Sequence, residues 1–366
     1  ALMAGKRMRN KNQEEDYDDI PDSVKKMSKK SKKKKKKHIF LKIVLILLAI
    51  IVILAGVLIG FVYSKIARVE HDDIDESQIE VTEGVETTGY RNIVLFGVDS
   101  RQNSYKSTLS DSIMIISINQ DTHKVRIASV YRDTYLKIGS SYDKITHAFA
   151  KGGPTLSLST LNTNLDLDLK EYVAVNFNVV VDVIDAVGGI DLEITSDEVK
   201  YINGYIDEVN SVTGHNSEHI TKAGTYHVDG VQAVAYSRIR YTSGGDYKRT
   251  ERQRDVLNLA FEKIKTMNLF ELNNLADVVL DEVSTNISTT QRIGLLSQVA
   301  NYEIEDTVGW PETKGYQPAD VWYGAPVNLE KQVQELHKFL FDEEDYQVSS
   351  TVKSISDTII KKTGYK

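Results

Sequence analysis

The sequence predicts a layered α/β domain, in which helices flank a central mixed β-sheet, preceded by a single transmembrane helix. Three observations predict this fold class. Residues 43–63 form an uncharged run of 21 residues. Two strand-like runs further along are separated by only four residues, which is typical of an antiparallel hairpin. The remainder alternates short apolar runs with helical patterns, as layered α/β proteins do.

Charge is distributed unevenly along the 366 residues, whose net charge is -7. Residues 1–42 carry 15 Lys/Arg against 6 Asp/Glu, whereas the remainder carries 30 against 46. The chain has no cysteine, which is compatible with a bacterial extracytoplasmic protein whose core is large enough to fold without disulfides. The reversal of charge across the uncharged run indicates membrane topology.

The uncharged run has the length of a membrane-spanning helix. A helix rises 1.5 Å per residue, so about 20 residues cross a hydrocarbon core of ~30 Å. A cleaved signal peptide has a shorter apolar region and a cleavage site, and no clear site follows here. We therefore expect residues 1–38 to be a disordered basic tail and residues 39–63 to be an uncleaved signal anchor.

Ten lysines between Lys25 and His38 precede this anchor, and an acidic segment follows it. The positive-inside rule places the N-terminus in the cytoplasm and the rest of the chain outside, as a single-pass protein of the bacterial cell membrane. Lysine runs also occur in nucleic-acid-binding proteins. Topology and attraction to anionic lipid explain this run more simply, so we expect no nucleic-acid partner.

Beyond the anchor, residues 64–88 are acidic and are expected to be a linker. Residues 89–345 are expected to form one extracellular domain, and residues 346–366 a C-terminal tail. The elements expected in order are strands over 92–99, 112–119 and 124–131, a helix opened by Pro154, a strand over 171–177, a helix over 179–187, a strand over 190–194, and helices over 228–241 and 250–267.

The hairpin brings charged side chains together at its open end. If Asn119 pairs with Lys124, counting outward places Asp111 opposite Arg132, with Asp133 next to it. Carboxylate and guanidinium groups would then meet where the two strands part. Two residues just past the end of the first strand are also expected nearby: Asp99 and Arg101.

The segment 237–254, with the sequence SRIRYTSGGDYKRTERQR, holds six basic side chains in eighteen positions. In an extended segment Arg238 and Arg240 would point to the same side, because the side-chain period is two. Two glycines then turn the chain, and a helix begins near Asp246 with Arg249 and Arg252 one turn apart. Two pairs of guanidinium groups would thus flank a glycine turn.

These arginines suit a phosphate ligand, because guanidinium forks bind phosphate oxygens bidentately. The alternative is a salt-bridged surface, but the only local acids are Asp246 and Glu251. Charge balance therefore requires an outside anion or acids from elsewhere in the chain. Carboxylates from the hairpin together with the arginines would fit a Mg²⁺-phosphate site, where Mg²⁺ takes one or two carboxylates and keeps several waters.

The residues resemble the LytR-CpsA-Psr family of bacterial envelope proteins. The resemblance covers about residues 89–265 and lies in VLFGVDSR, SDSIMIISIN, SVYRDTYLKI, YDKITHAFAKGG, FNVVVDVIDAVGGIDLEI and AVAYSRIRYTSGGDYKRTERQRDVL. Two departures stand out: Tyr131 stands where many relatives have proline, and Leu109 stands where many have a basic residue. Neither departure removes a metal or phosphate ligand.

The resemblance implies a transferase that moves an anionic glycopolymer, such as teichoic acid or capsular polysaccharide, from an undecaprenyl-pyrophosphate carrier to the muramic acid C6 hydroxyl of peptidoglycan. Mg²⁺ or Mn²⁺ is the implied cofactor. The implied metal ligands are Asp99 and Asp111. The implied pyrophosphate-binding residues are Arg101, Arg132, Arg238, Arg240, Arg249 and Gln253. Arg132, Arg238 and Arg240 would act in catalysis. We suggest Asp246 as the general base and Asp133 as the second candidate for that role.

The lipid tail of such a carrier would need an apolar binding site. We expect an apolar cleft between sheet and helices, lined by residues of the 173–187 region. Two alternatives stay open at this stage. One is a pyrophosphatase that uses the same residues with water as acceptor. The other is a non-catalytic module that binds lipid-linked polymer and regulates envelope assembly.

Overall fold

The computed structural model describes residues 60, 63–64, 70–72, 74–98, 108–279 and 282–366. The expected signal anchor lies almost wholly outside this part of the chain, as do Asp99 and Arg101. Within the described residues, none of the helices combines the length and the apolar character that crossing a bilayer requires.

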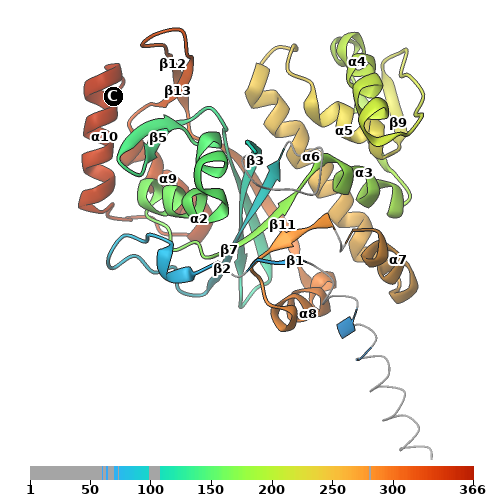
Figure 1. The fold of residues 1–366 in the computed structure, drawn as a ribbon, viewed down its shortest axis with the longest axis horizontal. Coiled ribbons are helices and arrows are strands. Elements are labelled where there is room, and N and C mark those ends of the chain that lie inside the picture. The colour runs from blue at the N-terminus through green and yellow to red at the C-terminus, as the bar shows by residue number, and fades with distance from the viewer. Residues whose placement is uncertain (1–59, 61–62, 65–69, 73, 99–107, 280–281) are drawn as a thin grey trace, which may run out of the picture. The chain divides into compact units, whose positions relative to one another are not determined.

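A seven-stranded mixed sheet forms the centre of the domain, as the sequence predicts (Figure 1). The first three long strands pair antiparallel, and β7 and β11 each add parallel to one of them. In spatial order the strands are β1 (Glu70–His71), β10 (Ser284–Thr285), β7 (Glu171–Val175), β2 (Tyr90–Val98), β3 (Ser110–Asn119), β4 (Lys124–Val130) and β11 (Glu303–Trp310).

The β3–β4 hairpin has the predicted register. Met114 lies opposite Ser129 and Ile118 lies opposite Val125. Extending the same count places Asp111 opposite Arg132. The two strands part at this end, and β2, β4, β7 and β11 all finish at the same edge of the sheet.

Both faces of the sheet are covered by helices. Alternating residues of β2 and β3, such as Phe96 and Ile115, pack on one face against α2, α9 and α10. Ile93 and Met114 point to the other face, where Leu257 of α6 and Leu295 of α8 pack near them. The bounds are α2 (Thr146–Leu165), α6 (Gly245–Thr266), α8 (Thr289–Ser297), α9 (Leu329–Phe341) and α10 (Ser350–Thr363).

A separate apolar cluster surrounds α5 beyond the sheet, and Figure 1 shows its elements on the right. It joins helices of the middle of the chain to a two-stranded hairpin. The elements are α3 (Phe177–Ala186), β8 (Ile190–Ile194), α4 (Ser196–Thr213), β9 (Gly224–Val228) and α5 (Gly230–Arg238). The predicted strand 190–194 is therefore present, but it pairs with β9 and not with the central sheet.

Three boundaries differ from those expected. Residues 346–366 are no tail, because α10 packs Val352, Ile355 and Ile359 into the main core. The acidic segment 64–88 contributes β1 and the buried Ile79 to the same domain. The helix expected from Pro154 begins earlier, at Thr146, and changes direction at two glycines with non-helical backbone, Gly152 and Gly153.

Smaller elements complete the described part of the chain. They are η1 (Glu76–Gln78), β5 (Tyr135–Ile138), β6 (Ser141–Lys144), α7 (Leu269–Val279), η3 (Val299–Asn301), β12 (Thr313–Tyr316) and β13 (Tyr323–Pro326). The strands β5 and β6 form one hairpin, and β12 and β13 form another directly after β11.

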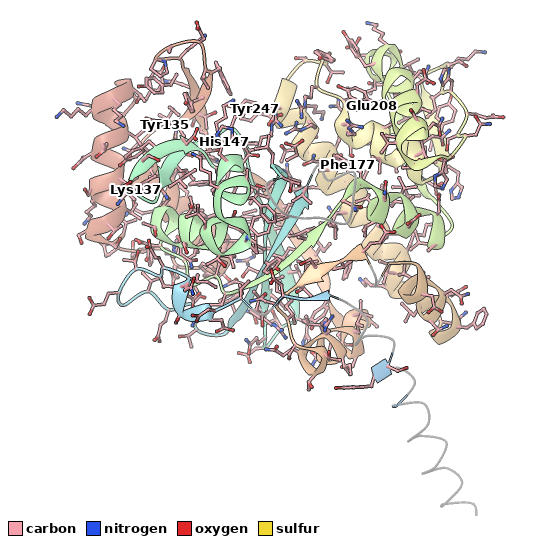
Figure 2. The ribbon with its side chains drawn as sticks, viewed as in Figure 1. Tyr135, Lys137, His147, Phe177, Glu208 and Tyr247 are labelled. Carbon is pink, nitrogen blue, oxygen red and sulfur yellow. The ribbon has the colours of Figure 1, made fainter. Side chains whose placement is uncertain are left out.

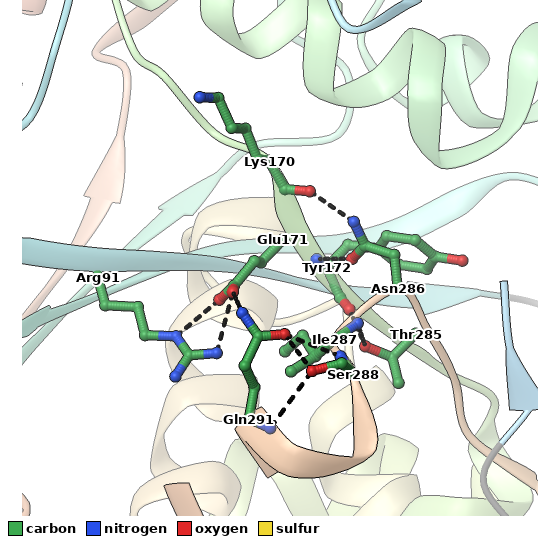
Figure 3. Close-up of polar contacts among 9 residues, drawn as sticks. All are labelled: Arg91, Lys170, Glu171, Tyr172, Thr285, Asn286, Ile287, Ser288 and Gln291. Atoms are coloured by element: carbon green, nitrogen blue, oxygen red, sulfur yellow. Dashed lines mark hydrogen bonds and ion pairs between the residues drawn. The ribbon is translucent and has the colours of Figure 1, made fainter. Parts of the chain in front are cut away.

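A polar network ties the parallel pair β2–β7 to the segment that leads into α8 (Figure 3). Arg91 binds Glu171 through two hydrogen bonds of 2.8 and 2.9 Å. Asn286 accepts a hydrogen bond from the backbone N–H of Tyr172 in β7. It donates another to the backbone oxygen of Lys170, which precedes that strand. Ser288 and Gln291 form the capping box of α8. This end of the fold is structural and lies apart from the predicted site residues.

Candidate active site

A polar pocket of about 550 Å³ lies where β3 begins and β4 ends. It gathers six of the nine site residues predicted from the sequence. The lining residues are Thr108, Leu109, Asp111, Arg132, Phe177, Tyr205, Arg238, Arg240, Tyr241, Arg249 and Gln253. Of the other three, Asp246 pairs with Arg249 but does not line the pocket, and Asp99 and Arg101 lie outside the described residues.

The hairpin end supplies an ion pair at the floor of this pocket. Arg132 Nη1 donates to Asp111 Oδ1 at 2.6 Å, and Arg132 Nε lies 3.8 Å from Asp133 Oδ2. Burial alone would lower the pKa of Arg132, but the carboxylates of Asp111 and Asp133 outweigh that effect and raise it. Asp133 is itself paired with Lys144 at 2.9 Å.

Arg249 is the most buried cation of the pocket, with 2% of its side chain exposed. Its Nη2 lies 2.8 Å from Asp246 Oδ1 and 3.4 Å from the backbone oxygen of Asp111. Its Nε and Nη1 groups are buried and have no acceptor among the described residues. Burial lowers the pKa of Arg249 to about 10, and the Asp246 carboxylate only partly offsets this. Buried donors without acceptors call for an explanation, and an anionic ligand would supply the acceptors.

Arg238 and Arg240 reach the same pocket from the end of α5. Arg238 is the last residue of that helix, and its guanidinium lies 4.9 Å from the centre of the Phe177 ring. It also donates to Glu208 of α4 at 2.8 Å. Arg240 is less constrained, because its ion-pair partner in the described part of the chain, Asp111, lies 3.9 Å away. Figure 2 shows Phe177 and Glu208 together on the α3–α4 side of the molecule.

Arg252 does not belong to the pocket, although it lies one helical turn from Arg249. It is buried against Glu198 of α4, with an Nε–Oε1 distance of 2.8 Å. Acids from elsewhere in the chain thus supply part of the expected charge balance, because α4 contributes Glu198 for Arg252 and Glu208 for Arg238. Both acids lie too far away in the sequence for local charge counting to find them.

The glycine turn between the two arginine pairs is confirmed. Gly244 and Gly245 have φ of 93° and 51°, in the left-handed region that other residues seldom adopt. The turn lets α6 start immediately beside the end of α5. Arg240 before the turn and Arg249 after it can therefore face one pocket.

An apolar cavity of about 220 Å³ adjoins the polar pocket, and both share Phe177 and Gln253. The predicted apolar cleft is thus present between the sheet and the helices. Leu95 and Met114 form its sheet side. The helical side comes from Val179, Val180, Val183 and Ile184 of α3, Val234 of α5, and Val256, Leu257 and Ala260 of α6.

Of the two predicted ligands for a divalent cation, only Asp111 lies in the described part of the chain. Its Oδ1 atom binds Arg132, whereas the ion-pair partner of Oδ2 among the described residues is Arg240, at 3.9 Å. One oxygen is therefore oriented to the pocket, which suits Mg²⁺ because that ion needs only one or two protein carboxylates. The described residues contain no group of three or more His, Asp or Glu side chains arranged so that they could hold a metal ion. Asp99, the second predicted ligand, lies outside them.

Asp246→Asn is expected to weaken binding of a lipid pyrophosphate and to leave the pH-rate profile unchanged. Asp246 pairs with Arg249 and does not line the pocket, so it is better placed to orient this arginine than to accept a proton. The measurement compares affinity and the pH profile of the variant with those of the wild type. Loss of one limb of the profile at unchanged affinity would instead support the general-base role.

Sequence comparisons find a matching family model and similar proteins. The LytR_cpsA_psr family model matches residues 57–336. A polyisoprenyl-teichoic acid–peptidoglycan teichoic acid transferase, TagU of Bacillus cereus, is 30% identical over 239 residues, covering 63% of this chain and 72% of its own. TagT of Bacillus subtilis, a transferase of the same description, is 28% identical over 256 residues, covering 68% of this chain and 75% of its own.

Solved structures share the fold. A structure of TagT bound to LIIa-WTA has a TM-score of 0.57 at 26% identity and covers 75% of this chain and 98% of its own. A structure of TagT with bound octaprenyl pyrophosphate lipid has a TM-score of 0.51 at 25% identity, covering 74% of this chain and 93% of its own.

Proposed function

The chain belongs to the LytR-CpsA-Psr family, and on that premise we propose that it is a membrane-anchored glycopolymer phosphotransferase. It would move an anionic glycopolymer of the teichoic acid or capsular polysaccharide type from undecaprenyl pyrophosphate to the muramic acid C6 hydroxyl of peptidoglycan. One observation carries the proposal. A pocket with four arginines opens next to an apolar cavity, as a ligand with a pyrophosphate head and a lipid tail requires.

The arginines would bind and orient the pyrophosphate. Arg249 would donate from its two unpartnered groups, and Arg132, Arg238 and Arg240 would neutralise charge on the phosphate oxygens in the transition state. Phe177 would mark the boundary between head and tail, because it lines both cavities. Mg²⁺ on Asp111 and Asp99 would supply further positive charge when bound.

The transfer is a phosphoryl substitution. The acceptor hydroxyl oxygen forms a bond to the phosphorus that carries the polymer, the bond from that phosphorus to the bridging oxygen breaks, and undecaprenyl phosphate leaves. The hydroxyl proton is released in the same reaction. The predicted anchor would hold the site at the outer surface of the plasma membrane, where the lipid carrier and the peptidoglycan are both within reach.

The test uses the full chain in detergent with a lipid-pyrophosphate-linked saccharide and peptidoglycan oligomers, with and without EDTA. We expect polyprenyl monophosphate to be released and saccharide to be joined to the glycan, and we expect EDTA to suppress both. Arg238→Ala should lower both products by about 10²–10³-fold, the loss typical of removing one charge-stabilising donor. Release of lipid phosphate at a rate indifferent to acceptor would indicate a pyrophosphatase. Lipid binding without turnover would indicate a binding module.

A further inference from the structure

The hairpin β12–β13 contacts segments that carry residues of the polar pocket, and none of its own residues lines the apolar cavity. It follows β11, whose last residue, Trp310, pairs with Val130 at the end of β4. The backbone N–H of Gly324 donates to Asp133 at 2.9 Å, one residue from Arg132. Tyr247 at the start of α6 also contacts the hairpin, through a hydrogen bond to Thr313. The hairpin is thus fixed directly to the segments that carry the site.

This hairpin presents aromatic surface to solvent. Trp322 is 44% exposed and lies in the loop 317–322, whose residues are all exposed. Its indole lies close against β12, because a Cβ on Gly315 would come within 2.8 Å of Nε1. The ring is therefore held against the hairpin while much of its surface remains open. Tyr316 and Tyr323 of the same hairpin are half-buried. The centres of their rings lie 5.2 and 4.9 Å from the centre of the Tyr135 ring.

Two ammonium groups lie over neighbouring rings, of which Tyr142 packs with Tyr135 and Tyr365 donates a hydrogen bond to Gly315 of β12. Lys362 lies 4.3 Å from the centre of the Tyr142 ring, and Lys314 lies 5.7 Å from that of Tyr365. Both lysines are exposed. A surface of aromatic faces with lysines around it suits a ligand that combines apolar ring faces with carboxylates. A glycan strand with acidic peptide side chains has that chemistry, because pyranose rings present C–H groups on their faces.

The in-line geometry of phosphoryl transfer also favours this surface as the place from which the acceptor approaches. Attacking and leaving oxygens lie roughly in line in phosphoryl transfer. The apolar cavity lies over β7, β2 and β3, so the lipid phosphate would depart toward that side. The acceptor must then approach across β4 and β11, where the hairpin stands. Figure 1 shows the hairpin and the start of α6 at one end of the sheet, and in Figure 2 Tyr247 lies between Tyr135 and Phe177.

We propose that the aromatic surface of β12–β13, centred on Trp322, is the subsite that binds the acceptor glycan of peptidoglycan. This inference rests on the proposed function, because it assigns a place to the acceptor of that reaction. It adds a binding site that is separate from the arginine pocket. The other occupants to be tested are a second copy of the chain and no specific ligand.

Direct binding tests the subsite without turnover. The chain has two tryptophans, and Trp310 is buried with 5% exposure, so acrylamide reaches mainly Trp322. Soluble peptidoglycan oligomers are expected to protect the wild-type fluorescence from acrylamide in the full chain in detergent. Trp322→Ala should abolish the protectable fraction. Absence of protection at any oligomer concentration would overturn the subsite, as would protection that depends on protein concentration without oligomers.

Steady-state kinetics provide a second test of the subsite. Trp322→Ala is expected to raise the KM for the acceptor about tenfold, with unchanged affinity for the lipid pyrophosphate. Phe270→Ala is the matched control, because Phe270 is an aromatic residue of α7 that is 72% exposed. An unchanged acceptor KM in Trp322→Ala would overturn the proposal. If the wild type joins no saccharide yet its fluorescence is protected, the transferase function fails and the glycan subsite stands.

Discussion

Arg249→Met is expected to lower glycopolymer transfer strongly while making the ligand-free protein more stable. The guanidinium is almost fully buried, and two of its donor groups have no acceptor among the described residues. Burial lowers its pKa to about 10, so the folded state binds this proton less tightly than the unfolded state does. The charged side chain therefore opposes folding at neutral pH. That cost is present below the folded-state pKa and disappears only at higher pH.

Methionine has similar length and no charge. Replacing a poorly compensated buried charge by an apolar side chain often raises the free energy of unfolding, here by about 1–4 kcal/mol. Transfer should fall by at least 10²-fold, because the donors that would bind the pyrophosphate are gone. Asp246 loses its partner but keeps access to water, since 27% of its side chain is exposed.

Thermal unfolding and turnover are the two measurements. Lipid pyrophosphate should stabilise the wild type and not the variant, because binding to the folded state alone raises the melting temperature. Arg240→Met is the matched control, as its side chain is 40% exposed. It should lower transfer with little change in stability. If Arg249→Met lowers both stability and activity, Arg249 is a structural residue and its donors do not await an anion.

The sequence was sufficient for the parts of the site that local geometry determines. A four-residue turn fixes the β3–β4 register, so Asp111 and Arg132 could be paired by counting. The arginine segment and its glycine turn are likewise contiguous in sequence. The partners on α4 were not accessible in this way, because Glu198 and Glu208 reach the arginines only after the chain has folded around α5.

The missed elements have different causes. The strand β11 lies at a sheet edge and carries Glu303, Glu305 and Asp306, so it shows no apolar run, as is common for edge strands. The C-terminal helix did carry a signal, since its buried residues are spaced three and four apart. The expectation of a tail over residues 346–366 did not use this spacing. Trp322 has no pattern at all, because its exposure depends on the hairpin that holds it.

Arg252→Met is expected to have the opposite effect on stability from Arg249→Met, although the residues lie three positions apart. Arg252 is equally buried, but its charge is fully compensated. Its Nε donates to Glu198 at 2.8 Å, Nη1 to the backbone of Ile239 at 3.1 Å, and Nη2 to Thr242 at 2.8 Å. Removing one partner of a buried pair leaves the other charge uncompensated, which costs about 3–5 kcal/mol.

Transfer should fall as well, for a positional reason. The hydrogen bonds of Arg252 hold Ile239 and Thr242, which flank Arg240 and follow Arg238. Without them the segment that carries Arg238 and Arg240, the two arginines proposed to bind the pyrophosphate, loses its fixed conformation. The loss is therefore expected mainly as weaker lipid-pyrophosphate affinity, and saturating substrate should recover much of the rate. Denaturant unfolding and substrate titration give the two quantities.

Glu198→Gln provides the matched test of this explanation. Glu198 also caps α4 by accepting from Thr195, and glutamine can keep that hydrogen bond because it serves equally well in a capping box. The double variant Glu198→Gln/Arg252→Met removes both charges, so it should be more stable than Arg252→Met alone. If the two substitutions are simply additive, the cost of Arg252→Met does not come from an uncompensated carboxylate. Lost packing against Tyr236, whose ring lies 5.6 Å from the guanidinium, would then be the cause.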